Sequence, residues 1–103
     1  MNAAASRVQP VAFHPGEILR EEYLLPLDMS AGALARKLNV PRTRIERLVA
    51  ETSPITTDTA LRLAKFFSTT PQFWMNMQAA YDLQEAVKSL AQELDKVAPL
   101  NAA

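Results

Sequence analysis

The residues of this sequence with the most evident chemistry are basic and lie close together, between positions 36 and 47. They are Arg36, Lys37, Arg42, Arg44 and Arg47, with Glu46 as the only acid among them. The segment has a net charge of +4, although the whole chain of 103 residues is neutral. Guanidinium groups form paired hydrogen bonds with phosphates and with the acceptor edge of guanine. The segment therefore indicates a surface for a polyanion, while residues 82–96, with a net charge of −2, indicate a second surface with another use.

A helix over residues 41–50 would present most of these side chains to solvent, because successive residues are about 100° apart around its axis. Ile45 and Leu48 then define the inward direction, and Thr43, Glu46 and Arg47 point away from it. The residues expected to contact DNA bases in the major groove are Arg42, Thr43 and Arg47. Those expected to contact DNA phosphates are Ser30, Arg36, Lys37 and Arg44. The alternative is a helix face that is only solvated. Glu46 is expected to pair with Arg42 or with a neighbouring helix rather than to accept from cytosine.

Helices alone are expected to position these residues, because no segment shows strand alternation, so the sequence predicts an all-α fold. Five helices are expected, over residues 15–25, 31–38, 41–50, 57–67 and 71–97. Pro15, Pro41 and Pro71 suit first helical positions, and Pro26 is expected to end the first helix. The buried residues expected on the first and fourth helices are Ile18, Leu19, Tyr23, Leu25, Ala60, Leu61, Leu63, Ala64 and Phe67.

The connection between the second and third helices is the most informative element. Only Asn39 and Val40 separate them, which is too tight for antiparallel packing and typical of the helix-turn-helix. Ala35 is small where the helices would cross, and Asn39 tolerates the left-handed conformation that ends a helix. The expected organisation is a flexible arm at 1–12, a helix-turn-helix DNA-binding and dimerisation domain at 13–97, and a frayed C-terminal tail at 98–103.

Other kinds of chemistry have few residues to support them. The chain has no cysteine and one histidine, His14, so a metal site is not expected and His14 is expected to cap the first helix. Both glycines precede residue 33, which excludes a glycine-rich phosphate loop. Asp82 and Glu85 have no nucleophile or metal partner, so no enzyme, cofactor or small-molecule substrate is expected. No apolar run reaches the ~18 residues of a membrane span, and residues 1–10 do not form a signal peptide, so a cytoplasmic protein without a membrane partner is expected.

The last helix carries an apolar seam that a small domain does not need for its own core. The seam follows a 3-4 spacing through Ala80, Leu83, Val87, Leu90, Leu94 and Val97. Its expected cover is the same helix of a second subunit, and the body of the domain or another protein are the alternatives. The aromatic and Met residues before the seam are expected in core or dimer packing, with a small-molecule pocket as the alternative. The residues expected at a dimer or partner interface are Phe73, Trp74, Met77, Leu83, Val87, Leu90 and Leu94.

Three blocks of the sequence resemble one known family. They are HPGEILREEY at 14–23, ITTDTALRLA at 55–64 and TPQFWMNMQ at 70–78. Their order and spacing are similar to those of the HigA-type antitoxins, a branch of the Xre/Cro-like helix-turn-helix family, from about Phe13 to Leu83. The resemblance implies a five-helix, lambda-repressor-like domain with a long C-terminal helix. It also implies a homodimer, operator DNA as a ligand, and a HigB-type toxin, an mRNA-cleaving ribonuclease, as a partner.

The function that this resemblance implies is a sequence-specific DNA-binding antitoxin that represses its own operon and neutralises its toxin. One alternative is a protein-interaction module that sequesters a partner without binding DNA, and another is a free-standing helix-turn-helix transcription regulator. The sequence departs from the family pattern at two places. Ala31 follows Ser30 where relatives usually have a Gln that contacts a phosphate, and Glu51 stands where they usually have glycine flanked by basic residues.

Overall fold

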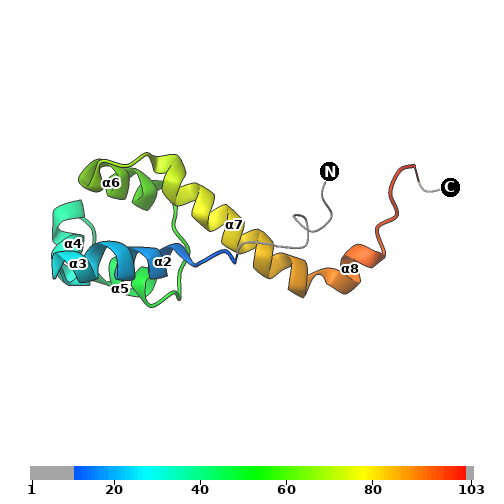
Figure 1. Cartoon of the computed structure of the whole chain (residues 1–103), viewed down its shortest axis with the longest axis horizontal. Helices are drawn as coiled ribbons and strands as arrows, with labels where there is room; N and C mark the ends of the chain where they lie inside the picture. Colours follow the sequence, from blue (N-terminus) through cyan, green and yellow to red (C-terminus); the bar gives the residue numbers. More distant parts are fainter. Residues whose placement is uncertain (1–10, 102–103) are drawn as a thin grey trace.

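The computed structural model describes residues 11–101, and every regular element in that range is helical (Figure 1). In chain order the elements are α2 (Pro15–Ile18), η1 (Leu19–Leu24), α3 (Leu25–Leu27), α4 (Ala31–Leu38), α5 (Arg42–Val49), α6 (Thr57–Phe67), α7 (Pro71–Ser89) and α8 (Ala91–Asp95). The predicted all-α fold is confirmed for these residues. The predicted arm falls mostly on residues 1–10, which lie outside the described range, as do the last two residues of the predicted tail.

The first three elements form one helical segment that changes its winding. Its backbone stays helical at the two junctions, and η1 is a π-helix in which the N–H of Leu25 donates to the carbonyl of Arg20. The prediction that Pro26 ends this helix is wrong, because the segment continues to Leu27 and ends at Asp28, whose φ is 51°. A proline lacks the N–H, and its ring clashes with the carbonyl four residues back, so the wider winding before Pro26 accommodates it.

The π winding also changes which side chains of the first helix face the core. The extra residue in the turn rotates the following positions, so Leu24 is buried and Leu25 is 69% exposed. The expectation that Leu25 is buried is therefore wrong. Leu61 of α6 is also exposed, because Ala60, Leu63 and Ala64 already form the buried face of that helix.

Local capping rules explain where most of the other helices begin. The hydroxyls of Ser30, Thr56 and Thr70 accept hydrogen bonds from the backbone of α4, α6 and α7. His14 caps α2, as predicted, by accepting from the N–H of Gly16 at 2.9 Å. Pro41 is not the first residue of α5 but its N-cap, because its ψ of 144° is extended, and α5 begins one residue later at Arg42.

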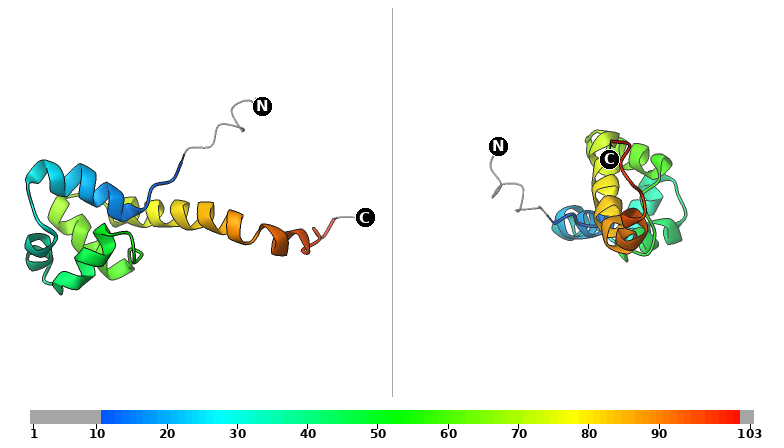
Figure 2. Two further views of the ribbon diagram at one scale, coloured as in Figure 1. Left: turned by 90° about the horizontal axis from the view of Figure 1, so that it is seen from below. Right: turned by 90° about the vertical axis from the view of Figure 1, so that its right-hand side faces the viewer.

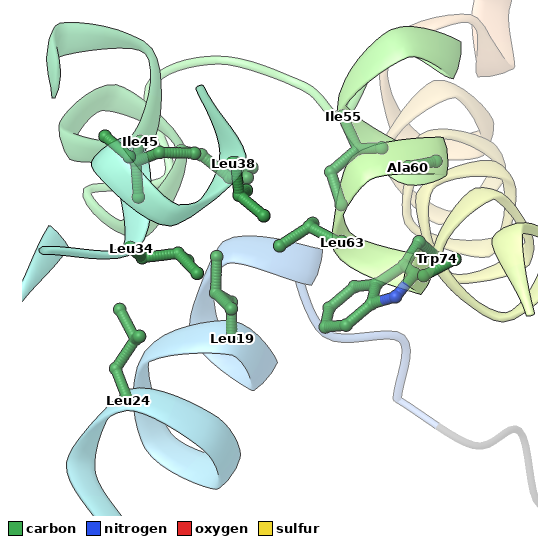
Figure 3. Packing of buried hydrophobic residues seen from close by; sticks show 12 residues of the cluster. Leu19, Leu24, Leu34, Leu38, Ile45, Ile55, Ala60, Leu63 and Trp74 are labelled. Atoms are coloured by element: carbon green, nitrogen blue, oxygen red, sulfur yellow. The ribbon is translucent and has the colours of Figure 1, made fainter. Parts of the chain in front are cut away.

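The core lies where α2, η1, α4, α5, α6 and the start of α7 meet. Figure 3 shows Leu19 and Leu63 pointing toward each other in its centre, with Leu34 and Ile45 on one side and Trp74 on the other. All five side chains are fully buried. Because α4 and α5 both contribute side chains to this core, packing of the whole domain fixes the position of α5.

The long C-terminal helix projects beyond this core, and the molecule measures 57 × 28 × 21 Å (Figure 2). It is not continuous to Val97 as predicted, because the backbone bends at Leu90, where φ is −105° and ψ is 5°. The Ser89 hydroxyl donates to the carbonyl of Ala86, and such a bond inside a helix favours a bend. The chain nevertheless continues helically as α8, which Figure 1 shows set off from the axis of α7.

The segment before α2 is attached to the middle of α7. The Ala12 N–H donates to Gln84 Oε1 at 2.9 Å, and Gln84 Nε2 donates to the Ala12 carbonyl at 3.1 Å. Between this segment and α7 lies an apolar groove of about 810 Å³. The residues that line it include Val11, Phe13, Ile18, Met77, Leu83 and Val87.

Candidate nucleic-acid interface

The turn between α4 and α5 has the predicted helix-turn-helix geometry. Asn39 adopts the left-handed conformation, with a φ of 59° and a ψ of 49°. Its N–H donates to the carbonyl of Arg36, and the N–H of Val40 donates to the carbonyl of Ala35, so two of the last carbonyls of α4 are satisfied by the turn. The second helix of the pair therefore follows the first after a tight, hydrogen-bonded turn.

The buried and exposed faces of α5 are those that the helix periodicity predicts. Ile45 and Leu48 are buried and attach the helix to the core. The predicted base-contacting residues Arg42, Thr43 and Arg47 are all exposed, and so are the predicted phosphate-contacting residues Ser30, Arg36, Lys37 and Arg44. The structure therefore places all the predicted residues on one helix pair. Ser30 is the N-cap of α4, Arg36 and Lys37 lie near its end, and the others lie on α5. We call Arg36, Lys37, Arg42, Arg44 and Arg47 the basic face.

Arg42 is held by neighbours on both helices of the pair. Its Nε lies 3.2 Å from a carboxylate oxygen of Glu46, one turn along α5, as predicted. Its side chain also passes over Gly32 of α4, where an added Cβ would lie 3.0 Å from Arg42 Cδ. The absence of a side chain at position 32 therefore leaves room for the Arg42 side chain.

Arg44 takes part in an ion-pair network that connects α5 with α6. Its Nη1 contacts Asp58 Oδ2, and the same oxygen lies 3.0 Å from Arg62 Nε. Arg62 Nη1 in turn donates to the carbonyl of Leu38 at 2.8 Å and to that of Asn39 at 3.4 Å. Hydrogen bonds from Arg62 and then from Arg44 lower the pKa of the Asp58 carboxyl below its ordinary value.

The C-terminal end of α5 is held by a different arginine. Arg20 of η1 donates to the carbonyl of Val49, the last residue of α5, and lies 3.2 Å from the carboxylate of Glu51. Cationic side chains favour such helix ends because the last carbonyls carry partial negative charge. Glu51 has a φ of 63°, which is the left-handed conformation that glycine adopts most readily. Glu51 therefore supports α5 at the place where the family pattern has glycine and basic residues.

Sequence reasoning did not identify these supporting residues. Asp58 and Arg62 are four positions apart, so their own pair could have been found from helix spacing. Their contacts with Arg44 and with the turn depend on how α6 packs against the helix pair, and no local signal shows that. In the part of the chain that the structure describes, Arg36, Lys37 and Arg47 take part in no ion pair.

The residues predicted for a dimer or partner interface fall into two groups. Phe73, Leu83, Val87, Leu90 and Leu94 are exposed along α7 and α8, and Met77 is partly exposed. Trp74, in contrast, is fully buried, and its Nε1 donates to the Thr69 hydroxyl at 2.8 Å. The prediction that Trp74 lies at an interface is therefore wrong, because the ring has no surface left for a partner. Its place is in the core of the subunit.

Two features of the described residues bear on other functions. Within residues 11–101, no cluster of three or more His, Cys, Asp or Glu residues could hold a metal ion. Among the helices that the structure describes, none is long and apolar enough to cross a membrane.

Comparisons with known proteins agree with this geometry. Residues 19–74 match a family model described as helix-turn-helix. The chain is 48% identical to virulence-associated protein I of Dichelobacter nodosus, over 98% of this chain and 93% of that protein. It is 34% identical to antitoxin HigA-1 of Vibrio cholerae, over 82% of this chain and 80% of the relative.

A solved structure gives the same result. The antitoxin HigA of Pseudomonas aeruginosa, determined with the higBA promoter, superposes with a TM-score of 0.84 and 41% identity. The match covers 87% of this chain and 99% of that one. Members of this family are DNA-binding regulators and antitoxins rather than enzymes. The chain belongs to the helix-turn-helix family and, within it, to the branch that contains the HigA-type antitoxins.

Proposed function

We propose that this protein is a DNA-binding antitoxin that represses its own operon and neutralises a HigB-type ribonuclease toxin. The observation that carries the proposal is the basic face, which a helix-turn-helix packed against the core through Ile45 and Leu48 presents to solvent. The relationship to an antitoxin solved with its own promoter supports operator DNA as the ligand. A protein that acts on operator DNA works in the bacterial cytoplasm.

The roles of individual residues follow from their exposure and chemistry. We propose that Arg42, Thr43 and Arg47 contact base edges in the major groove, because they lie on the exposed side of α5. Arg36, Lys37 and Arg44 contact backbone phosphates. Ser30 joins them, because its Oγ accepts from the N–H of Ala33 and its hydroxyl hydrogen is still free to donate. The proposed division is testable, because base contacts carry sequence preference and phosphate contacts do not.

We further propose that the apolar seam joins two copies of the chain. Leu83 and Val87 are each more than half exposed, and Leu94 continues the same exposed row on α8. Burying side chains of this size contributes about 1.5–3 kcal/mol each. Homodimers with twofold symmetry are the commonest soluble oligomers, and a twofold dimer would present two α5 helices to a palindromic operator. The half-sites would then lie about one helical turn, ~34 Å, apart.

A second candidate is a protein-interaction module that sequesters a partner without binding DNA. The exposed seam and the apolar groove beside it favour this candidate, because both offer a large apolar surface to another protein. The negative charge of Glu51 beside the end of α5 is also unfavourable for a nearby phosphate. A third candidate, a free-standing regulator, requires DNA binding without a toxin.

Two assays separate the three candidates. In the first, a gel-shift series uses fragments of the chain's own promoter at low salt, and the antitoxin predicts a complex with a palindromic fragment. In the second, the chain is co-expressed with the product of the neighbouring small reading frame, and the antitoxin predicts that growth is restored. Rescue of growth without any shift favours the interaction module, and a shift without a toxin to neutralise favours the free-standing regulator. If the chain gives no gel shift and does not restore growth, the proposed function is contradicted.

A further inference from the structure

Asp58 connects three parts of the DNA-binding unit through one carboxylate. It lies in the first turn of α6, and its Oδ2 binds Arg44 on α5 and Arg62 on α6. Arg62 extends the network to the carbonyls of Leu38 and Asn39 at the end of α4. Through Arg44 and Arg62, this exposed carboxylate therefore links α5, the turn and α6.

This carboxylate also competes for a cation that DNA would otherwise bind. Arg44 is the residue of the basic face whose guanidinium is bound by an acid from another helix, since Glu46, the partner of Arg42, belongs to α5 itself. A guanidinium binds carboxylates and phosphates with the same donors, so the two acceptors compete for it. The Arg44 side chain is 41% exposed, so a phosphate can still reach it when the duplex lies in the correct position.

The cost of this competition differs between operator and other DNA. Binding to non-operator DNA comes almost entirely from cations that replace the counterions of the phosphate backbone. Binding to an operator also has base contacts, which hold the duplex in one position against α5. If a carboxylate holds one cation until the duplex is correctly placed, the loss of that cation therefore weakens binding to non-operator DNA more than binding to the operator.

We propose that Asp58 is a specificity-determining residue, which binds Arg44 and so limits the affinity of the protein for DNA of any other sequence. The proposal rests on the proposed function, because it requires that DNA binds at α5. Asp58 does not itself contact a base, and it acts by positioning Arg44. The low pKa of the Asp58 carboxyl keeps it ionised, and thus able to bind both arginines, throughout the neutral range.

The test compares Asp58→Asn with the wild-type chain on two duplexes of equal length, the operator and a scrambled sequence. Fluorescence anisotropy at several salt concentrations gives the affinity and its salt dependence. For the scrambled duplex we expect the slope of log K against log salt to steepen by about 0.9 per subunit, the value for one added phosphate contact. We also expect the ratio of operator to scrambled affinity to fall by roughly 3- to 10-fold.

Two controls show whether the effect passes through Arg44. Asp95→Asn removes the same charge from α8 and should leave the ratio unchanged. In an Arg44→Gln background, Asp58→Asn should no longer steepen the slope. If Asp58→Asn does not fold, as judged by circular dichroism, Arg44→Gln alone still decides. If Asp58 holds Arg44 away from scrambled DNA, then Arg44→Gln should change the salt slope for the scrambled duplex by less than Lys37→Gln does.

Several results would overturn the inference. These are an unchanged slope and ratio in Asp58→Asn, the same change in Asp95→Asn, or a change that persists without Arg44. In each of these cases the wild-type chain still binds its operator, so the proposed function stands. A wild-type chain that binds neither duplex contradicts the proposed function and this inference together.

Discussion

Gly16→Ala adds only one methyl group but should destabilise the protein clearly, because Gly16 is where α2 approaches the backbone of α5. A Cβ built at Gly16 would lie 1.7 Å from the carbonyl oxygen of Leu48 and 2.7 Å from its carbon. Carbon–oxygen contacts do not ordinarily fall below about 3.3 Å, so α2 and α5 would have to separate by roughly 1.5 Å. Both groups are backbone within helices, so no side-chain rotation can relieve the contact.

The magnitude follows from two opposing effects. Forcing an extra methyl into a packed site costs about 1–3 kcal/mol, and sometimes more. Alanine contributes up to about 1 kcal/mol over glycine inside a helix, and less here because Gly16 is only the second residue of α2. We therefore expect a net loss of about 0.5–2.5 kcal/mol, or a fall in Tm of roughly 2–20 °C for a domain of this size.

The matched control is the other glycine of the chain. An added Cβ at Gly32 meets the Cδ of Arg42 at 3.0 Å, and that atom belongs to a flexible side chain that can move away. Gly32→Ala should therefore not be destabilising, and it should gain less than about 1 kcal/mol from helix propensity because Gly32, too, is only the second residue of its helix. It should nevertheless reduce discrimination between operator and scrambled DNA, because Arg42 is displaced from its place above α4.

Thermal and urea unfolding followed by circular dichroism provide the measurement. All variants are compared at one protomer concentration, because dimerisation makes Tm depend on concentration. If Gly16→Ala unfolded at the wild-type temperature, the close approach of α2 to α5 would not exist in solution. If Gly32→Ala lost as much stability as Gly16→Ala, the difference between backbone and side-chain obstruction would not explain the result.

Three sets of substitutions test the assignment of the interfaces, and a pH titration tests the ion pairs of Asp58. Arg47→Ala should weaken operator binding by about 1–3 kcal/mol and relax sequence preference in a binding-site selection, because it removes a proposed base contact. Lys37→Ala should weaken all DNA alike and reduce the salt slope by about 0.9 in anisotropy titrations, and a changed sequence preference would contradict its assignment to a phosphate. Leu90→Asp with Leu94→Asp should abolish the dimer in light scattering and operator binding with it, whereas an intact dimer that no longer neutralises toxin would assign the seam to the toxin. For Asp58, whose pKa is lowered by Arg62 and Arg44, the carboxyl resonance in NMR should titrate below 3.8. Its contribution to stability should be complete above 3.8 and lost as pH falls through that lower midpoint, and a midpoint at or above 3.8 would contradict the ion pairs.

The features that were predicted from sequence are those that local chemistry determines. His14 caps α2 because a side-chain acceptor placed before a helix binds one of its first free N–H groups. Asn39 ends α4 because it tolerates the left-handed conformation better than most residues. Each of these rules acts over four residues or fewer, so the sequence alone contains the necessary information.

The errors come from features that depend on the surroundings. Pro26 breaks an ordinary helix, but a π-helical turn before it accommodates the ring, and that turn moves Leu25 to the surface. Trp is a residue type that is common at interfaces, but Trp74 is fully buried because α6 and η1 pack against the start of α7. The contact between Asp58 and Arg44 likewise joins residues on separate helices, so helical spacing could not predict it.

The pair of hydrogen bonds between Ala12 and Gln84 has a consequence for the order of folding. The two residues are 72 positions apart, so this contact closes nearly the whole domain into one loop. Closing a long loop costs more chain entropy than forming the neighbouring contacts of α4 and α5, so we expect the contact between Ala12 and Gln84 to form late in folding. The apolar groove between residues 11–13 and α7 is complete only after this last closure. We therefore expect Gln84→Ala to accelerate unfolding in stopped-flow experiments while leaving the folding rate almost unchanged.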